Sequence, residues 1–250
     1  MNAISPDLAS VLPIPLPGVD APEAVMSLAV AGDMGFGDDG NRDRRSRWLR
    51  GSGFDPGRSA SVDLVHSRIV AEAATPAGVR GRAADGMVAP GLSSPRTDAS
   101  TSLVITVADC MPIFLFDSGT GAFGLLHSGW KGTGILAVAV SAMGRLYGTE
   151  PRNVSAAFGP RIGACCYVVD EERAKEYADE FGSAAVVRVG GAPRLDLVAA
   201  NLGIADRLGL GSVSVADGCT CCDGRFGSYR RQGAARFTRM AAAIGYRSSP

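Results

Sequence analysis

The chain has 250 residues and a mass of 25.7 kDa, which is enough for one large domain or two small ones with a substantial core. Lysine plus arginine equals aspartate plus glutamate at 25 each, so no global charge attracts nucleic acid. A hydrophobic content of 46% with 33 glycines is typical of a globular protein with many tight turns, and it shows no bias toward disorder.

The sequence carries no signal for export or for a membrane. Its first residues lack a basic segment followed by an apolar run, and no apolar stretch is long enough to span a bilayer. We therefore expect a cytoplasmic protein, a monomer or a homodimer, without a membrane partner. In that compartment the six cysteines stay reduced and act as packing residues, metal ligands or nucleophiles.

The first hundred residues predict few regular elements. Residues 1–25 are rich in Pro and Ala with little periodicity, and they predict an extended or partly disordered arm ahead of a single domain over 26–250. A turn at 37–42 leads into a short helix. The Pro-, Gly- and Ser-rich segment 75–100 predicts a long loop around the short piece 84–88, and loops of this length are often functional.

From residue 103 onward, strand-like and helix-like patterns alternate. Short β-branched or aromatic runs predict strands, and apolar residues at helical spacing predict helices. The expected strands are 103–107, 113–116, 122–127, 154–158, 185–189 and 213–216, and the expected helices are 133–147, 170–181 and one from about 197 to 209. The alanine-rich tail 237–244 fits either a strand or a helix. Because there is no regular βαβ period, the pattern favours an α+β fold over a doubly wound sheet.

The chain has two histidines, His66 and His127, and each stands beside a candidate site segment. Together with Cys110 they are a suitable set for holding zinc through three protein ligands, with a fourth position for water or substrate. Cys110 ends a predicted strand, where Pro112 interrupts normal continuation of the ladder. Taken by itself, Cys110 fits a buried structural cysteine better than a ligand. The small number of imidazoles excludes any mechanism that needs many histidines.

A glycine-rich turn follows His127 and precedes the expected helix. Its backbone N–H groups and the charge of Lys131 suit an anion such as phosphate or a carboxylate, although a tight packing turn explains Gly132 equally well. Near the C-terminus four arginines lie close together, among them Arg230 and Arg239. They form either an anion clamp, because guanidinium groups bind phosphate oxygens in pairs, or a solvated basic face.

The remaining cysteines offer an alternative metal site. Cys219 and Cys222 have the two-residue spacing of a zinc knuckle, and only Cys165 and Cys166 remain as the second pair. Neighbouring side chains point apart in an extended chain, so Cys165 and Cys166 do not easily serve one site. We therefore favour structural thiols over a separate zinc at this stage.

Six motifs occur in an order that identifies a family. They are Ala108–Pro112, His127–Gly132, Gly159–Tyr167, Leu195–Leu197, Cys219–Thr220 and Ser228–Arg231. Over roughly residues 30–245 the chain thereby resembles the laccase-domain or YfiH-like family, also called polyphenol oxidase or purine nucleoside phosphorylase. The resemblance implies a YfiH-like α+β architecture in which mixed sheets are flanked by helices. It also implies a metal bound by His66, Cys110 and His127.

The chain departs from the family pattern at three places. Leu64 and Ser67 stand around His66 where the family usually has Gln-Val-His-Gly, and Lys131 stands where an arginine is usual. The family's Thr-Gly-Arg is matched by a sequence that ends in Arg239. Lys131 keeps the positive charge but loses the bidentate fork of an arginine.

The resemblance implies a zinc-dependent purine nucleoside phosphorylase that converts adenosine, inosine or methylthioadenosine and phosphate into base and ribose 1-phosphate. Adenosine deamination by a metal-activated water is a second reaction of such a site. Expected catalytic residues are Cys110, with Asp109 or Asp85 as acid or base. Expected phosphate- and substrate-binding residues are Lys131, Gly132, Arg230 and Arg239. Copper is the alternative metal, because histidine and cysteine also bind copper.

Three other functions remain open on the sequence. Oxygen reduction by several coppers is excluded, because one site of two histidines and one cysteine uses both imidazoles of the chain. A polyphenol oxidase with a single copper is still compatible with the sequence. An amidase-like hydrolase acting on a cell-wall precursor would use Cys110 as nucleophile and His127 as base. A non-enzymatic metal-binding module would close the site with a fourth protein ligand.

Overall fold

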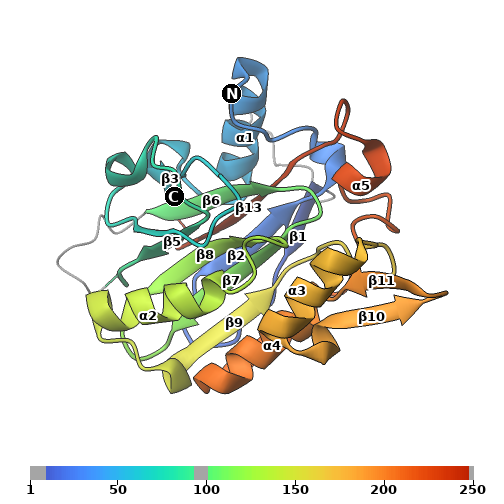
Figure 1. The fold of residues 1–250 in the computed structure, drawn as a ribbon. Helices are drawn as coiled ribbons and strands as arrows, with labels where there is room; N and C mark the ends of the chain where they lie inside the picture. Colours follow the sequence, from blue (N-terminus) through green and yellow to red (C-terminus); the bar gives the residue numbers. More distant parts are fainter. Residues whose placement is uncertain (1–9, 93–100, 248–250) are drawn as a thin grey trace.

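The structure is a computed structural model that describes residues 10–92 and 101–247 (Figure 1). Two β-sheets stack face to face, and helices cover their outer faces. The five-stranded sheet has the order β1-β2-β13-β6-β3, and the six-stranded sheet has the order β12-β9-β7-β8-β5-β4. Parallel pairs occur beside antiparallel ones in both sheets, so both are mixed. The α+β fold predicted from the sequence is confirmed.

The elements have the following bounds in chain order. The strands are β1 (Val11–Pro13), β2 (Glu23–Ser27), β3 (Ser59–Ala60), β4 (Val70–Glu72), β5 (Gly86–Ala89), β6 (Ser102–Val107), β7 (Met111–Asp117), β8 (Phe123–Ser128), β9 (Val154–Phe158), β10 (Val186–Val189), β11 (Ala192–Leu195), β12 (Ser212–Val215) and β13 (Met240–Gly245). The helices are α1 (Asp39–Gly51), α2 (Ile135–Tyr147), α3 (Glu171–Phe181), α4 (Leu197–Leu208) and α5 (Tyr229–Gln232). Short 3₁₀ turns are η2 (Ala29–Ala31), η3 (Pro56–Arg58), η4 (Pro76–Val79), η5 (Pro151–Asn153) and η6 (Ser183–Ala185).

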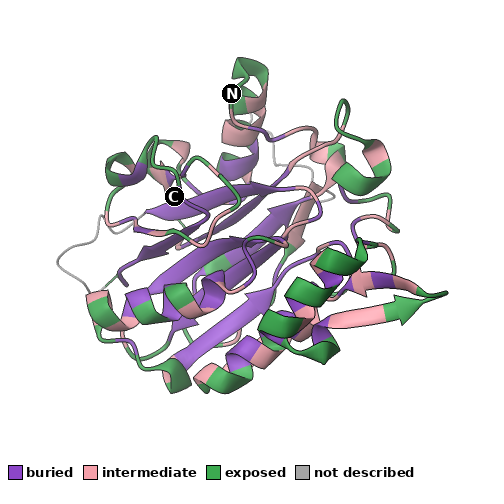
Figure 2. Cartoon of the chain, viewed as in Figure 1, coloured by how far each residue is buried: buried purple, intermediate pink, exposed green. Residues whose placement is uncertain are grey.

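Alternating side chains build separate cores on the two faces of each sheet. In β7, Ile113 and Leu115 pack with helices α2, α3 and α4, whereas Phe114 points into the core between the sheets. The period of two is the ordinary geometry of a strand. Both faces are covered, and therefore the strands of the interior are buried along their whole length (Figure 2). This double burial explains why the sequence shows continuous apolar runs.

The alanine-rich tail is strand β13, which lies between β2 and β6 in the five-stranded sheet. Ala242 and Ile244 face the other sheet, and Ala241 and Ala243 face the cluster around Trp48 of α1. Alanine has no strong strand preference, so its place here is set by pairing on both sides and by the narrow space between layers.

The N-terminal third differs from expectation in two segments. Residues 1–9 lie outside the described residues, but from residue 11 on the expected arm pairs into the five-stranded sheet as β1 and continues into β2. The expected loop 75–100 contains β5, which pairs with β4 and β8; its part from 93 to 100 lies outside the described residues. These strands are short, and β2 and β5 pair with the distant strands β13 and β8, so local pattern does not reveal them.

Pro112 does not interrupt a strand, contrary to the prediction. It lies inside β7 opposite His127, and its carbonyl accepts a hydrogen bond from Gly159 N at 2.9 Å. The bend occurs earlier, at Asp109, whose φ is 82°. The chain crosses there from β6 in one sheet to β7 in the other.

The topology gathers six connections at one end of the two sheets. The pairing registers bring the ends of β6, β8, β9 and β12 together with the starts of β5, β7 and β13. All motif segments from Ala108 to Arg231 that identify the family, except Leu195–Leu197, lie in or beside these connections. In the two described stretches of the chain, no helix is long and apolar enough to cross a bilayer.

Candidate active site

Cys110 lies in the short crossing between the two sheets, and the turn after β8 closes around it. A Cβ at Gly129 would lie 2.5 Å from Cys110 Sγ, so only glycine fits beside the thiol. The preceding Asp109 has its carboxylate bound on both oxygens, by Thr220 Oγ1 at 2.6 Å and by the Arg230 backbone N–H at 2.7 Å. Asp109 therefore ties the strained connection between β6 and β7 to the C-terminal loops.

Asp85 holds both histidines in place. One carboxylate oxygen, Oδ1, lies 2.9 Å from His127 Nδ1 and accepts the backbone N–H of His66 at 3.0 Å. The other, Oδ2, accepts the backbone N–H and the hydroxyl of Ser67, at 2.5 and 2.8 Å, and the backbone N–H of Val65 at 3.3 Å. These bonds stabilise the left-handed conformation of His66, whose φ is 58°. The Asp85 side chain is fully buried.

The structure brings His66, Cys110 and His127 together. Their nitrogen and sulfur ligand atoms all lie within 4.8 Å of one another, and the two imidazole rings meet edge to face with centroids 5.1 Å apart. Because His127 Nδ1 is bound to Asp85, its Nε2 is the nitrogen left for a metal, as in carboxylate–histidine–metal arrangements. Two imidazoles and one thiol are a donor set that zinc or copper accepts, so the residues fit the implied metal.

Charge at the site is coupled between the thiol and its neighbours. Burial alone would raise the pKa of Cys110, but His127 and His66 lower it to about 6. Burial alone would lower the pKa of His127, but Cys110 and Asp85 raise it to about 10. The pKa of Asp85 is lowered to about 2, because hydrogen bonds from His127 and Ser67 outweigh the cost of burial. In the metal-free protein the three groups therefore favour a thiolate, an imidazolium and a carboxylate.

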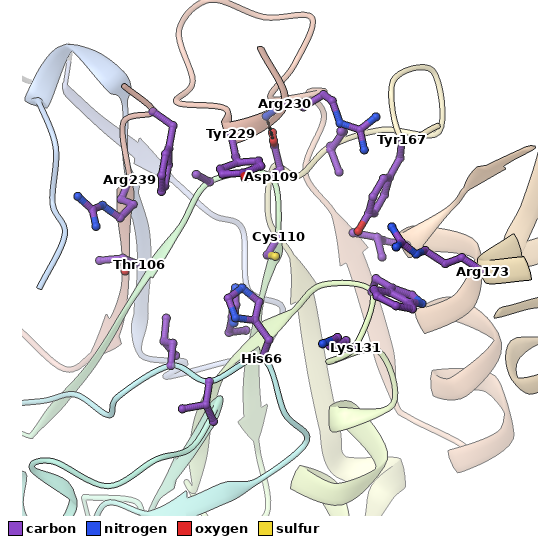
Figure 3. Close-up of a pocket in the computed structure, with 18 residues that line it drawn as sticks. His66, Thr106, Asp109, Cys110, Lys131, Tyr167, Arg173, Tyr229, Arg230 and Arg239 are labelled. Atoms are coloured by element: carbon purple, nitrogen blue, oxygen red, sulfur yellow. Dashed lines mark hydrogen bonds between the residues drawn. The ribbon is translucent and has the colours of Figure 1, made fainter. Parts of the chain in front are cut away.

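His66, Cys110 and His127 line a cavity of about 760 Å³ (Figure 3). Its wall includes four cationic side chains, Lys131, Arg173, Arg230 and Arg239. It also includes four aromatic ones, Trp130, Tyr167, Tyr229 and Phe237. A concave, largely apolar wall with a few convergent polar groups is typical of a small-molecule site.

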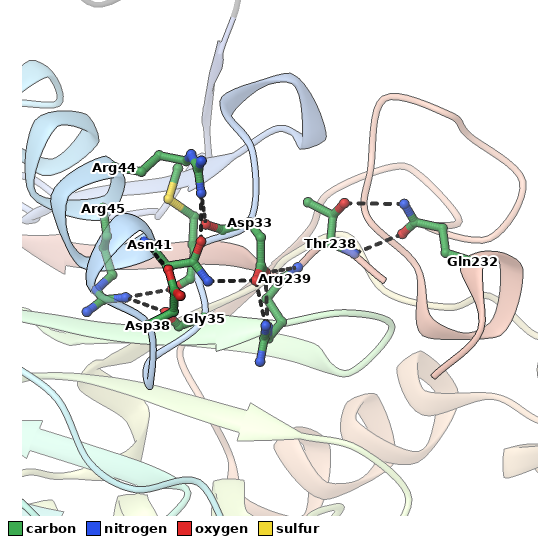
Figure 4. Close-up of polar contacts among 10 residues, drawn as sticks. Asp33, Gly35, Asp38, Asn41, Arg44, Arg45, Gln232, Thr238 and Arg239 are labelled. Carbon is green, nitrogen blue, oxygen red and sulfur yellow. Dashed lines mark hydrogen bonds and ion pairs between the residues drawn. The ribbon is translucent and has the colours of Figure 1, made fainter. Parts of the chain in front are cut away.

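The cations expected from the sequence differ in how they are held. Arg230 donates to the carbonyls of Cys166 and Val168 at 3.1 and 3.2 Å. Arg239 forms an ion pair with Asp33, 206 residues away, through Nε and Nη2 (Figure 4). Among the ion pairs of residues 10–92 and 101–247, none involves Lys131, whose Nζ lies 5.7 Å from the Trp130 ring centroid. Lys131 is therefore the cation most available to a ligand.

Gly132 is not among the residues that line the cavity. A Cβ there would lie 2.9 Å from the His127 carbonyl oxygen, so the glycine allows a tight turn. Helix α2 begins only after Gly134, where the Arg68 guanidinium lies against the backbone and pairs with Glu180. The packing explanation of these glycines thus fits the structure, and the helix N-terminus does not face the cavity.

Sequence reasoning missed two parts of the wall. Arg173, in the first turn of α3, stacks over Trp130 with its Cζ 4.0 Å from the ring centroid. Tyr229 and Phe237 form an edge-to-face pair with centroids 5.1 Å apart. Their signal was the aromatic residues flanking the arginine cluster.

Comparison with known proteins places the chain and its fold in one family. The family described as multi-copper polyphenol oxidoreductase laccase matches residues 27–247. A purine nucleoside phosphorylase of Deinococcus radiodurans is 33% identical over 81% of this chain and 76% of its own, and one of Streptomyces coelicolor is 32% identical over 72% of each chain. The crystal structure of YlmD from Geobacillus stearothermophilus covers 92% of this chain and 93% of its own with a TM-score of 0.81 and 25% identity. The chain therefore belongs to the laccase-domain family that its ordered motifs resemble.

Proposed function

We propose that this protein is a zinc-dependent purine nucleoside phosphorylase with the metal at His66, Cys110 and His127. The observation that carries the proposal is the meeting of this three-residue ligand set with cationic and aromatic side chains in one cavity. Two relatives that align with most of the chain bear the name purine nucleoside phosphorylase. Held by these three residues, zinc would supply Lewis-acid chemistry beside the cavity.

The cavity wall accounts for both substrates of a phosphorolysis. The rings of Tyr229 and Phe237 offer an apolar surface to a purine, while Lys131 and Arg230 attract the phosphate. An oxygen of hydrogen phosphate forms a bond to ribose C1′ as the bond from C1′ to the purine nitrogen breaks, and the proton of the hydrogen phosphate passes to the leaving purine. The protein contributes mainly by holding the phosphate in line and by balancing its charge.

Asp85 and Asp109 act in this proposal as positioning residues. Each carboxylate is already engaged on both oxygens, and Asp85 lies behind the histidines with a pKa near 2, so neither is suited to carry a proton to substrate. Asp85 orients the metal-binding imidazoles, and Asp109 orients the backbone at Arg230. Arg239, which forms an ion pair with Asp33, is part of the cavity wall.

The test combines metal analysis with product identification. Purified protein is analysed for zinc and copper and assayed with adenosine, inosine and methylthioadenosine, with and without phosphate. We expect one zinc at this site and ribose 1-phosphate that requires phosphate. Inosine formed from adenosine without phosphate would report the deaminase reaction. If ribose 1-phosphate never forms and metal removal changes no turnover, the proposal is wrong.

One observation favours a second function, an amidase-like hydrolase. Cys110, His127 and Asp85 have the order of a nucleophile, a base and an orienting carboxylate, with Asp85 Oδ1 2.9 Å from His127 Nδ1. A zinc-bound thiolate is a poor nucleophile, so the two functions compete for one sulfur. Amide hydrolysis by metal-free protein that zinc suppresses would favour the hydrolase.

A further inference from the structure

Four of the other five cysteines meet at a second place in the structure. Cys165 and Cys166 come from the loop after β9, and Cys219 and Cys222 come from the loop after β12. Their four Sγ atoms all lie within 4.8 Å of one another. Cys222 Sγ lies 3.6 Å from Cys165 Sγ and 3.3 Å from Cys166 Sγ.

The adjacent pair reaches one centre because the chain turns there. The backbone N–H groups of Cys166 and Tyr167 both donate to the Gly163 carbonyl, at 2.9 and 3.1 Å, so residues 164–166 form a tight turn. The prediction that Cys165 and Cys166 point apart assumed an extended chain and is wrong. In a turn, consecutive side chains are no longer placed on opposite faces.

The spacing of the sulfurs is that of a tetrahedral zinc site. Zinc–sulfur bonds of about 2.3 Å place the sulfurs of a tetrahedron about 3.8 Å apart. The four thiols already approach this spacing, and a disulfide would need about 2.05 Å between two of them. Cys219 and Cys222 also supply the two-residue spacing of a zinc knuckle, with Cys222 N donating to the Cys219 carbonyl at 3.1 Å.

The surroundings suit a negatively charged centre. The Gly163 backbone N–H donates to Cys219 Sγ at 3.2 Å, which is an outer-shell contact of the kind that orients metal ligands. Guanidinium groups hold the carbonyls of both loops: Arg194 binds that of Cys165, Arg230 that of Cys166, and Arg231 that of Cys221 at 2.9 Å. Four thiolates around Zn²⁺ carry a net charge of about −2, which these cations offset.

We propose that Cys165, Cys166, Cys219 and Cys222 bind one zinc ion as a structural site separate from the His66–Cys110–His127 set. All four ligand positions come from protein, so this centre is closed to substrate. It ties the loop after β9 to the segment that holds Asp109 through Thr220 and carries Tyr229 and Arg230 into the cavity wall. The proposal is independent of the reaction that the cavity performs.

Metal content measured by mass spectrometry on the purified full-length protein tests the site directly. We expect two zinc ions per chain in the wild type and one in Cys219→Ser/Cys222→Ser. Cys221→Ser is the matched control, because Cys221 lies in the same loop but outside the four-sulfur group, and it should retain two. Cys110→Ser should retain one. The same zinc content in the wild type and in Cys219→Ser/Cys222→Ser, or iron at the second site, would overturn the proposal.

Two measurements on the wild type guard against variants that fail to fold. Cobalt substitution should give the intense thiolate charge-transfer bands of a tetrahedral four-sulfur site, and these bands should persist in Cys110→Ser. Alkylation followed by peptide mass analysis should show Cys165, Cys166, Cys219 and Cys222 protected until a chelator is added. A thiol count in denaturant without reductant that falls short by two would reveal a disulfide instead and would refute the zinc site.

Discussion

The substitution Asp85→Asn separates the positioning of the imidazoles from the ligands themselves. Asp85 accepts hydrogen bonds on both oxygens, from His127 and His66 on one and from Ser67 and Val65 on the other. An asparagine must turn its NH₂ group toward one of these donor sets. If it faces His127, that ring must carry its proton on Nε2 and loses the lone pair that a metal needs.

The expected magnitude follows from the role of such outer partners. Loss of a carboxylate that orients a metal-binding histidine typically costs 10- to 100-fold in metal affinity, or about 1.4 to 2.8 kcal/mol. If the NH₂ instead faces Ser67, two backbone donors stay unsatisfied and the left-handed turn at His66 is strained. Both orientations weaken zinc binding, so the direction does not depend on which one forms.

Competition against a chromophoric zinc chelator measures this change in affinity. Asp117→Asn is the matched control, because Asp117 is equally buried and accepts two hydrogen bonds, from Gly119 N and Thr120 Oγ1, at the opposite end of β7. That end is about 20 Å from the site by strand length. Asp117→Asn should lower stability and leave zinc affinity unchanged. An Asp85→Asn protein that binds zinc within twofold of the wild type would refute the positioning role.

Three further predictions follow from the site. The lowered pKa of Asp85, about 2 against 3.8 unfolded, stabilises the metal-free fold above pH 4 and loses that effect as the pH falls toward 2. The excess unfolding free energy of wild type over Asp85→Asn in urea should therefore shrink from about 2 kcal/mol near neutrality to zero; a constant difference would contradict this. Lys131→Ala should raise the KM for phosphate about tenfold, and Lys131→Arg should restore it; an unchanged phosphate KM would remove Lys131 from the site. Gly129→Ala should displace Cys110 Sγ, because the new Cβ would lie 2.5 Å from it. Zinc affinity should fall while circular dichroism shows a folded protein. Unchanged zinc affinity would show that the turn moves to accept the Cβ and would contradict this prediction.

The sequence predicted the elements that have one clear hydrophobic periodicity. It did not predict the strands whose position depends on pairing with other strands. Helix α2 and strands β6, β7 and β8 were predicted to within about two residues, because their apolar patterns are long and unambiguous. The alanines of β13 have no such pattern, and β2 and β5 depend on partners far along the chain. No local window contains that information.

For the site, the small number of histidines was the informative signal. Only two imidazoles exist, so a three-ligand set with Cys110 had to use both His66 and His127, and the structure brings the three together. The links that hold them were not readable, because Asp85 reaches His127 across 42 residues and Arg239 reaches Asp33 across 206. The cysteine centre was underrated because a turn, not a strand, carries Cys165 and Cys166.

The family's description as a multi-copper laccase conflicts with the ligands that this chain can offer. A blue-copper site of the two-His, one-Cys type would use both imidazoles of the sequence, and a copper cluster that reduces oxygen would need further ones. The second centre brings together only thiols, which suit zinc, copper(I) or an iron–sulfur group and offer no imidazole. The histidines therefore support at most one imidazole-bound copper, at His66, Cys110 and His127. Oxygen reduction by several coppers would need a second imidazole site, which this chain cannot form. The side chains of the cavity beside the His66, Cys110 and His127 centre must therefore define the reaction.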